Sequence, residues 1–226
     1  MSSEPAKATS QTDRLQWTAA VLLLATVLLV ANRRLVSGAD CPKWDADMFF
    51  APFQMLVADH ARAGTFLLWD PWFNGGSPDY AEPQVGSFSP FAVILGFLTG
   101  GTEVGFRVYW LTIWWWGGVG VILLGRHLGA PAWGACVIAL GFAFSGFCTG
   151  HAEHTSTLYT ISWLPSIVWR LDVALASRRL RPAVEAGVLW GLSALGGYPA
   201  WVLLNACFVT LWAVGRWCCP ERSQSP

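Results

Sequence analysis

Apolar residues occur in long runs along this chain, and short polar or Gly- and Pro-rich segments separate the runs. A transmembrane helix needs about 20 predominantly apolar residues, and several runs approach or reach that length. The pattern predicts an all-α fold, a polytopic transmembrane helical bundle of about six spans. The expected spans are residues 15–35, 104–124, 130–150, 155–172, 184–196 and 201–214.

Both ends of the chain are polar. Residues 1–14 are small and polar, which predicts a disordered cytoplasmic tail. The run that follows is long for a signal peptide and has no clear cleavage site after it, so we expect a first transmembrane helix that stops at Arg33 and Arg34. The transmembrane domain then covers 15–217, and 218–226 form a polar C-terminal tail.

The longest polar break, residues 36–90, is rich in acidic and aromatic residues and in Gly and Pro, and it predicts a large first extracytoplasmic loop. Within it, residues 47–63 place apolar and polar side chains at helical spacing, which is typical of a helix that lies in the membrane interface. The next apolar run, 91–98, is too short to cross the hydrocarbon core. We expect a re-entrant or interfacial segment there, or the start of a broken helix.

Composition agrees with a membrane protein and adds an orientation. The chain is 54% hydrophobic and only 12% charged, against about 25% charged residues in soluble domains, so the lipid bilayer is the expected partner. The formal net charge of +0 gives no argument for nucleic acid. Because Lys and Arg favour the cytoplasmic side, we expect an inner (plasma) membrane protein with its N-terminus in the cytoplasm. This places Lys7, Arg14, Arg126, Arg178, Arg179, Arg181, Arg216 and Arg222 inside, and Arg33, Arg34, Lys43, Arg62 and Arg107 outside.

With this topology three polar segments share the outer face: the large loop, the sequence HAEH at 151–154, and a Gly-Tyr-Pro turn before the last span. In HAEH, His151 and His154 share a face if the segment is helical, and with Glu153 they suit a divalent metal. A porphyrin-type pigment, a haem, or a satisfied polar cluster without a ligand are the alternatives. The large loop also has a turn signal at 74–78, whose glycines either shape the loop or offer bare N–H groups to a phosphate.

Several of these motifs resemble those of a known family. Residues 69–78, WDPWFNGGSP, are similar to the WNPxxxGGxP signature of the bacterial YfhO-like membrane proteins, which belong with the GT-C glycosyltransferases. Asp70 stands where the family has Asn, and Tyr198 stands where it has His. The likeness covers about residues 15–215 and only the N-terminal part of the longer family. Its other matching blocks are Glu82-Pro83-Gln84 with Phe88-Ser89-Pro90, Ser145-Gly146-Phe147 through His154 with Trp163-Leu164-Pro165, and Gly196-Gly197-Tyr198-Pro199-Ala200.

The resemblance implies transfer of a sugar from a polyprenyl-phosphate donor on the extracytoplasmic face. Such a transfer needs a carboxylate that takes the acceptor's proton and a means to stabilise the departing phosphate. Asp45 and Asp47, at the start of the outer loop, are the candidate catalytic residues; two residues apart, they share a face in an extended chain and diverge in a helix. The alternative is that Asp45 is the N-cap, and Asp47 a first-turn charge, of the helix expected at 47–63.

The remaining expectations concern ligands and partners. The residues expected to bind substrate are Asp70, Asn74, Gly75, Gly76, Gln84, His151, His154 and Tyr198. Glu153 is the candidate metal ligand; the cofactor stays open, with a divalent metal ion as the candidate. A polyprenyl-phosphate sugar donor is the expected small-molecule partner. The alternative function is a non-catalytic accessory subunit of a larger membrane protein complex, for example one that carries pigments or electrons.

Overall fold

The computed structural model describes residues 11–218 and is helical throughout, apart from loops and one isolated β-bridge in that range. Four helical stretches are long and apolar enough to cross a membrane: α1 (Gln11–Ala31), α5 (Glu103–His127), α6 and α7 together (Ala132–Gly150), and α10 (Pro199–Cys218). This confirms the all-α fold class and indicates a membrane protein. The other helices are α2 (Arg33–Val36), α3 (Ala51–Arg62), α4 (Pro90–Thr99), α8 (Thr155–Ser177) and α9 (Leu180–Ala194), with the short helical turns η1 (Ala46–Phe50), η2 (Phe73–Gly75), η3 (Asp79–Ala81) and η4 (Pro83–Val85).

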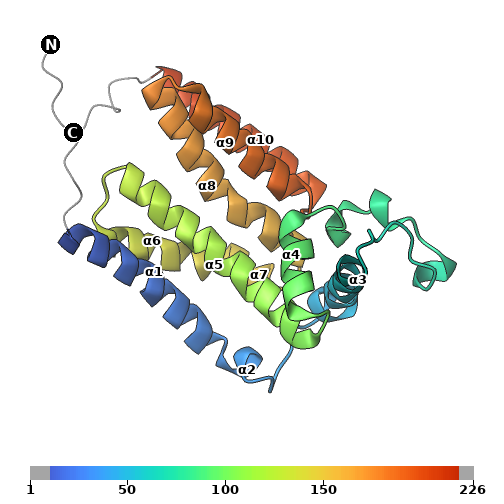
Figure 1. Cartoon of the computed structure of the whole chain (residues 1–226). Coiled ribbons are helices and arrows are strands. Elements are labelled where there is room, and N and C mark those ends of the chain that lie inside the picture. Colours follow the sequence, from blue (N-terminus) through green and yellow to red (C-terminus); the bar gives the residue numbers. More distant parts are fainter. Residues whose placement is uncertain (1–10, 219–226) are drawn as a thin grey trace, which may run out of the picture.

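The long helices lie side by side, and those that follow each other along the chain run in opposite directions (Figure 1). Central among them is α8, which packs on α5, α9 and α10 and has more buried residues than any other described helix. Many of these are Ser or Thr, so α8 is less apolar than the four helices above although it is 23 residues long. Hydroxyl groups are tolerated here because they bond to the helix backbone, as Thr160 does to the Ser156 carbonyl at 2.9 Å. That α8 and the 15-residue α9 also cross the membrane stays a prediction.

Glycines in α5 allow α8 to approach closely. A Cβ atom at Gly120 would lie 2.7 Å from the Ser166 Oγ, and one at Gly117 would lie 3.0 Å from the Ser162 Oγ. Both contacts are tighter than side chains normally make, so the two helices meet along a face without Cβ atoms on the α5 side. Small residues at a helix–helix contact are typical of membrane bundles.

The large loop folds around α3 and α4. The helix expected at 47–63 is present as η1 followed by α3, and its buried side packs on α4: a Cβ at Gly96 would lie 2.8 Å from the Cβ of Ala58. The apolar run at 91–98 forms a separate helix of ten residues, α4, which ends at Gly100 in the left-handed region (φ 76°). The Ser89 hydroxyl caps its start by accepting from the Ala92 N–H at 3.3 Å.

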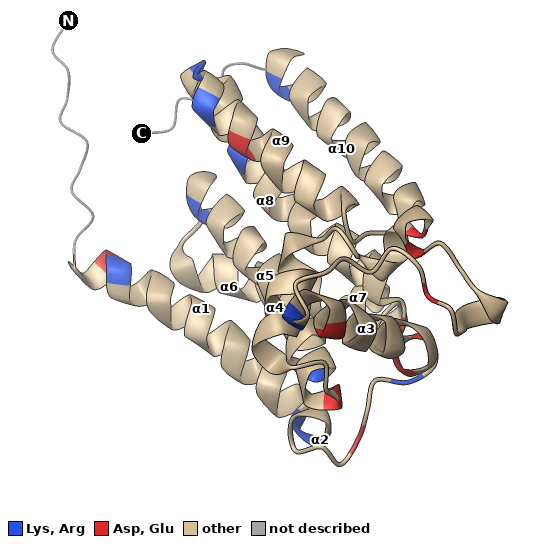
Figure 2. Cartoon of the chain, turned by 45° about the vertical axis from the view of Figure 1, so that its right-hand side comes forward, with Lys and Arg blue, Asp and Glu red and all other residues tan. Residues whose placement is uncertain are grey.

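Charged residues gather toward the two ends of the bundle, while most of the helical ribbon between them has none (Figure 2). At one end lie the α1–α2 junction and the large loop. At the other end Arg126 pairs with Asp13 at 3.2 Å and lies over the Trp17 ring, 5.2 Å from its centroid. This arrangement is what a bilayer-spanning bundle requires.

The expected tails need one correction. Residues 11–14 are not part of a disordered tail, because α1 begins at Gln11 and includes them. An ion pair of Asp13 with Arg126 and a hydrogen bond from Trp17 Nε1 to Asp13 (3.0 Å) hold this first turn against α5. Residue 218 likewise belongs to α10. The rest of both predicted tails, 1–10 and 219–226, lies outside the described residues.

Candidate functional site

The start of the large loop meets the turn between α7 and α8. The carboxylate Oδ2 of Asp45 lies 3.7 Å from the Nε2 of His154, and the Nδ1 of His154 lies 3.3 Å from the Nδ1 of His151. The Oε1 of Glu153 is 3.9 Å from the same His154 nitrogen. We call these four residues the His–Asp cluster. It confirms that the loop and HAEH lie at the same end of the bundle.

Backbone geometry places Asp45 in this cluster. Trp44 has a positive φ of 58° and its carbonyl accepts from the N–H groups of Asp47 (3.0 Å) and Met48 (2.9 Å), so the helix begins one residue earlier than expected. Asp45 therefore has helical angles, φ −57° and ψ −31°, and its side chain caps no N–H. Asp45 thus stands at the N-cap position of η1, as the alternative expected, but without the capping hydrogen bond. Its carboxylate is instead free to face His154.

The two candidate catalytic carboxylates point to different places. Because η1 is helical, Asp47 turns away from Asp45 and lines a small cavity of about 180 Å³ with Glu103 and Arg107. The Arg107 guanidinium there donates to Glu103 at 2.8 Å. Asp45 alone of the two joins the His–Asp cluster.

The HAEH segment is a turn rather than a helix. It still brings the two imidazoles together, because His151 ends the backbone turn that leads into α8 and accepts from the His154 N–H at 3.0 Å. In this contact one imidazole donates through its Nδ1–H and the other accepts at its Nδ1. Trp201 of α10 packs on the ring of His151 at 6.1 Å between centroids.

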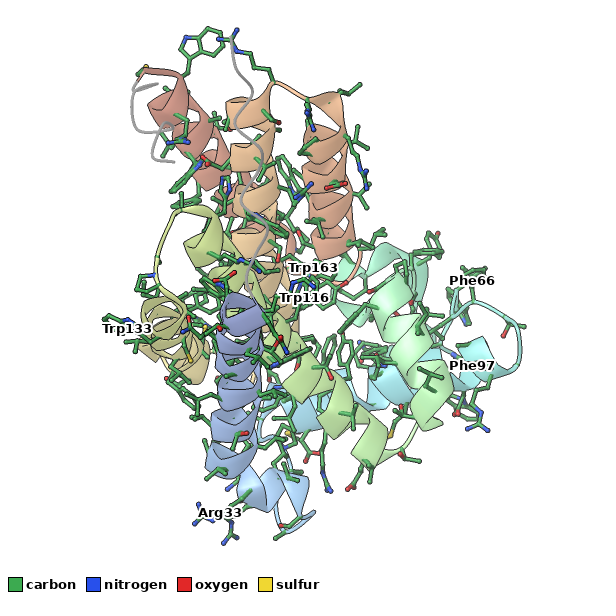
Figure 3. The ribbon with its side chains drawn as sticks, turned by 60° about the vertical axis from the view of Figure 1, so that its left-hand side comes forward. Arg33, Phe66, Phe97, Trp116, Trp133 and Trp163 are labelled. Atoms are coloured by element: carbon green, nitrogen blue, oxygen red, sulfur yellow. The ribbon has the colours of Figure 1, made fainter. Side chains whose placement is uncertain are left out.

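A cavity of about 370 Å³ borders the cluster, between the end of α1 and the α7–α8 turn. Trp44 and Glu153, which flank Asp45 and His154 in sequence, form part of its wall. Its other side is cationic, with Arg33, Arg34 and Lys43. Arg34 pairs with the half-exposed Asp40 at 3.2 Å, whereas Arg33 and Lys43 have no ion-pair partner among residues 11–218. Arg33 is the first residue of α2 and projects outward at this end of the bundle (Figure 3).

The third polar segment of this face joins the loop through α8. Gln84 accepts from the Ser156 hydroxyl at 3.0 Å, and the Ser156 carbonyl accepts from the Tyr198 N–H at 3.3 Å. The Tyr198 N–H also donates to the hydroxyl of Thr160 at 3.0 Å. The Gly-Tyr-Pro turn therefore lies at the same end of the bundle as the loop and HAEH, as predicted. The turn makes these contacts through the backbone of Tyr198, and the Tyr198 ring is half-exposed.

The WDPWFNGGSP motif forms a turn that closes on itself. Asp70 and Ser77 exchange two backbone hydrogen bonds, of 2.9 and 2.8 Å, and the buried Asp70 carboxylate accepts from the Trp72 N–H at 2.8 Å. Asn74, Gly75 and Gly76 all have positive φ (51°, 77° and 122°), and a Cβ on Gly76 would lie 2.7 Å from the Trp69 ring. The contacts of these residues shape the turn, which supports the structural interpretation; their role in substrate binding stays a prediction.

The expected metal site has no preformed ligand set. No three His, Cys, Asp or Glu side chains within the described part of the chain are arranged to hold a metal ion. The reason lies in the turn at HAEH: the imidazoles face each other through Nδ1 instead of pointing side by side toward a common centre. Metal binding by Glu153 therefore gains no support from the structure.

Two buried carboxylates were not expected as site residues. Asp79, in the large loop, is 1% exposed, and neither of its carboxylate oxygens has a hydrogen-bond partner among residues 11–218. Burial, with further contributions from the charges of Asp70 and Glu82, raises the pKa of the Asp79 carboxyl above its usual range. No motif singles out this residue; only its burial does.

The other buried carboxylate, Asp172 of α8, lies at the opposite end of the bundle and is 0% exposed. One oxygen accepts from the Trp212 Nε1 at 2.9 Å and contacts the Arg216 Nε at 2.7 Å. The other contacts the His127 Nε2 at 2.8 Å and accepts from the Arg216 Nη2 at 3.2 Å. This group, which we call the Asp172 clamp, ties α5 and α10 to α8. A lone Asp in an apolar run was the only sequence signal for it.

Comparison with protein-family models, with curated proteins and with solved structures gave no match for this chain. The class that the structure defines is an all-helical membrane protein with a polar site at one end of the bundle. The likeness to the YfhO-like family stays a prediction from the motifs.

Proposed function

We propose that this chain works as a GT-C-like transferase, which moves a sugar from a polyprenyl-phosphate donor to a hydroxyl acceptor. The single observation that supports this most is the pair of Asp45 and His154, 3.7 Å apart, beside a cationic cavity at one end of the bundle. We place that end at the extracytoplasmic face of the inner membrane, with the start of α1 in the cytoplasm. The bias of Lys and Arg toward the other end supports this orientation.

In the proposed reaction Asp45 is the base. The acceptor's hydroxyl oxygen attacks the anomeric carbon of the sugar, its proton passes to the Asp45 carboxylate, and the bond from the anomeric carbon to the phosphate oxygen breaks. Polyprenyl phosphate leaves with the electron pair of that bond. His154 orients the carboxylate and, when protonated, stabilises its charge, which is the usual role of a neighbour to a catalytic base.

The cations of the cavity match the other requirement of the reaction, since negative charge develops on the leaving phosphate. Arg33 and Lys43 have no carboxylate partner among the described residues, so an anionic group can pair with them without displacing another. Their position also fits a lipid donor, because α1 ends beside the cavity at the edge of the apolar band. Cations on the outer side run against the usual bias toward the cytoplasm, and a phosphate ligand would account for them.

A transfer assay in membranes tests the proposal. The assay follows a radiolabelled sugar from a polyprenyl-phosphate donor into acceptor material. Loss of a general base costs about 100-fold or more, so Asp45→Asn is expected to abolish most transfer. Asp59→Asn, the same change on the exposed side of α3, is the matched control and should retain it. Transfer that Asp45→Asn leaves unchanged would remove Asp45 as the base, and loss in Asp47→Asn alone would assign the role to Asp47.

A second candidate function is the non-catalytic subunit of a larger membrane complex. The observation that favours it is α10, of which Asn205 is the only buried residue within the described helix. Leu203, Leu211 and Trp217 leave a broad apolar face to lipid or to a partner protein. Purification in mild detergent separates the two functions: a fixed-stoichiometry complex without sugar transfer supports the subunit, and an active isolated chain supports the transferase.

A further inference from the structure

A second cavity, separate from the proposed transferase site, lies between α5, α8 and α9 toward the end that carries the Asp172 clamp. Its volume is about 440 Å³, and most of its wall is apolar, with Trp116 and Leu123 from α5 and Val188 and Leu189 from α9. Trp116 lies near the middle of the bundle and packs on Trp163 at 5.3 Å between ring centroids (Figure 3). The cavity therefore extends from mid-bundle toward one membrane surface.

Cations lie at the surface end of this cavity, which we call the groove and of which Arg170 forms part of the wall. Arg170 of α8 and Arg181 of α9 both pair with Glu185, and the Arg170 guanidinium lies over the Trp169 ring, 4.8 Å from its centroid. Two arginines share one carboxylate, so positive charge is in excess. Arg178 and Arg179 in the turn between α8 and α9 add to it and have no ion-pair partner in residues 11–218. Figure 2 shows these charges together at that end of α8 and α9.

The groove also contains buried polar atoms without partners. The Nε of Arg170 and the Oγ of Ser166 have none among the described residues, and Ser166 is 2% exposed. The two residues are four apart on α8, so they lie on one face about 6 Å apart along the axis. Polar groups without partners at membrane depth are costly, which favours a ligand that supplies acceptors.

We propose that this groove binds one anionic glycerophospholipid. Its phosphate would pair with Arg170 and Arg181, its ester carbonyl would accept from Ser166 one helical turn deeper, and an acyl chain would lie along Trp116 and Leu189. The order of chemistry along the groove, from cations to a single hydroxyl to apolar side chains, matches the order along such a lipid. Basic pockets between transmembrane helices are known sites for anionic headgroups. The inference does not depend on the proposed transferase function.

Native mass spectrometry of the detergent-purified chain tests this. The protein is titrated with phosphatidylglycerol and, separately, with phosphatidylcholine of the same acyl chains. One phosphatidylglycerol is expected to remain bound at about tenfold lower concentration than phosphatidylcholine. Equal retention of the two lipids would overturn the proposal. A photocrosslinker placed at position 188 gives a second readout, and a crosslink to a copurifying protein in place of lipid would also overturn it.

Two variants localise the site. Arg181→Gln removes a cation whose side chain is 89% exposed, so folding is preserved while the preference for phosphatidylglycerol falls severalfold. Val188→Trp fills the groove and is expected to remove the tight binding. The controls are Arg62→Gln at the opposite end and Val137→Trp on the lipid-facing side of α6, both of which should bind as wild type does. Binding that survives both groove variants would contradict the assignment.

Discussion

We predict that the Asp172 clamp makes a large contribution to the stability of the fold. The change Asp172→Ala removes a fully buried carboxylate and leaves His127, Trp212 and Arg216 without their partner. Arg216 and Trp212, which both contact Asp172 of α8, lie on α10, the helix with the fewest buried residues among the long described helices, so α10 depends strongly on this contact. We expect the chain to lose stability and α10 to become the first helix to open.

The magnitude follows from burial. Removing one partner of a buried ion pair typically costs about 3–5 kcal/mol, because the other charge stays buried without compensation. The exposed pair of Arg34 and Asp40, in contrast, has side chains that are 69% and 38% exposed, and such pairs contribute about 0–1 kcal/mol. Asp172→Ala should therefore destabilise the fold by several kcal/mol, and the control Asp40→Ala by less than about 1 kcal/mol.

Reversible denaturation in detergent, followed by tryptophan fluorescence and far-UV circular dichroism, measures both variants. The double variant Asp172→Ala/Arg216→Met adds a test of cause, because it removes the orphaned guanidinium and should recover part of the loss. Equal stability of Asp172→Ala and Asp40→Ala would refute the reasoning. The reasoning would also be refuted if the loss of stability in the double variant equalled the sum of the losses in Asp172→Ala and in Arg216→Met measured alone.

Two further predictions concern packing and pH. Gly120→Val should destabilise the bundle by about 1–3 kcal/mol, because a Cβ there already meets the Ser166 Oγ at 2.7 Å. The control is Gly141→Val, because a Cβ at Gly141 has nothing within 4 Å. Equal melting temperatures of the two variants would contradict the tight α5–α8 contact. Asp79→Asn should stabilise the chain at neutral pH, by about 1–3 kcal/mol for a buried group without partners. The raised pKa of Asp79 means that the wild type loses stability as pH rises from the ordinary Asp value through the folded-state value, so the advantage of Asp79→Asn should grow over that range and then level off. A gap between the two melting temperatures that stays constant with pH would count against the buried charge.

The hydrophobic pattern was enough to predict the helices, because lipid and core contacts both require apolar runs. At 91–98 it indicated a segment too short to cross a membrane and left open a re-entrant or interfacial segment or the start of a broken helix; the structure has the ten-residue α4 there. The central position of α8 was not predictable from apolarity: its buried face is rich in hydroxyls, and only packing on α5, α9 and α10 shows why they are tolerated.

The candidate site was predicted in its parts and not in its geometry. The alternation of spans predicts that the loop, HAEH and the Gly-Tyr-Pro turn lie at one end, and the contact of Asp45 with His154 agrees with this. The sequence pattern could not tell which of Asp45 and Asp47 would reach the HAEH segment. The direction of each side chain depends on where the helix begins, and the positive φ of Trp44 sets that start. The buried Asp79 and Asp172 were missed because their partners, or lack of them, come from distant elements.

The central claim is that the His–Asp cluster faces the outside of the cell, and two cysteines at opposite ends of the bundle test it directly. Cys41 lines the cationic cavity, and Cys218 ends α10 beyond the Asp172 clamp; both are free thiols and at least partly accessible. In a Cys219→Ser background, intact cells are treated with a membrane-impermeant maleimide. The proposed orientation predicts that Cys41 is labelled and that Cys218 is labelled only after lysis. Labelling of Cys218 with protection of Cys41 would place the site in the cytoplasm and contradict the account.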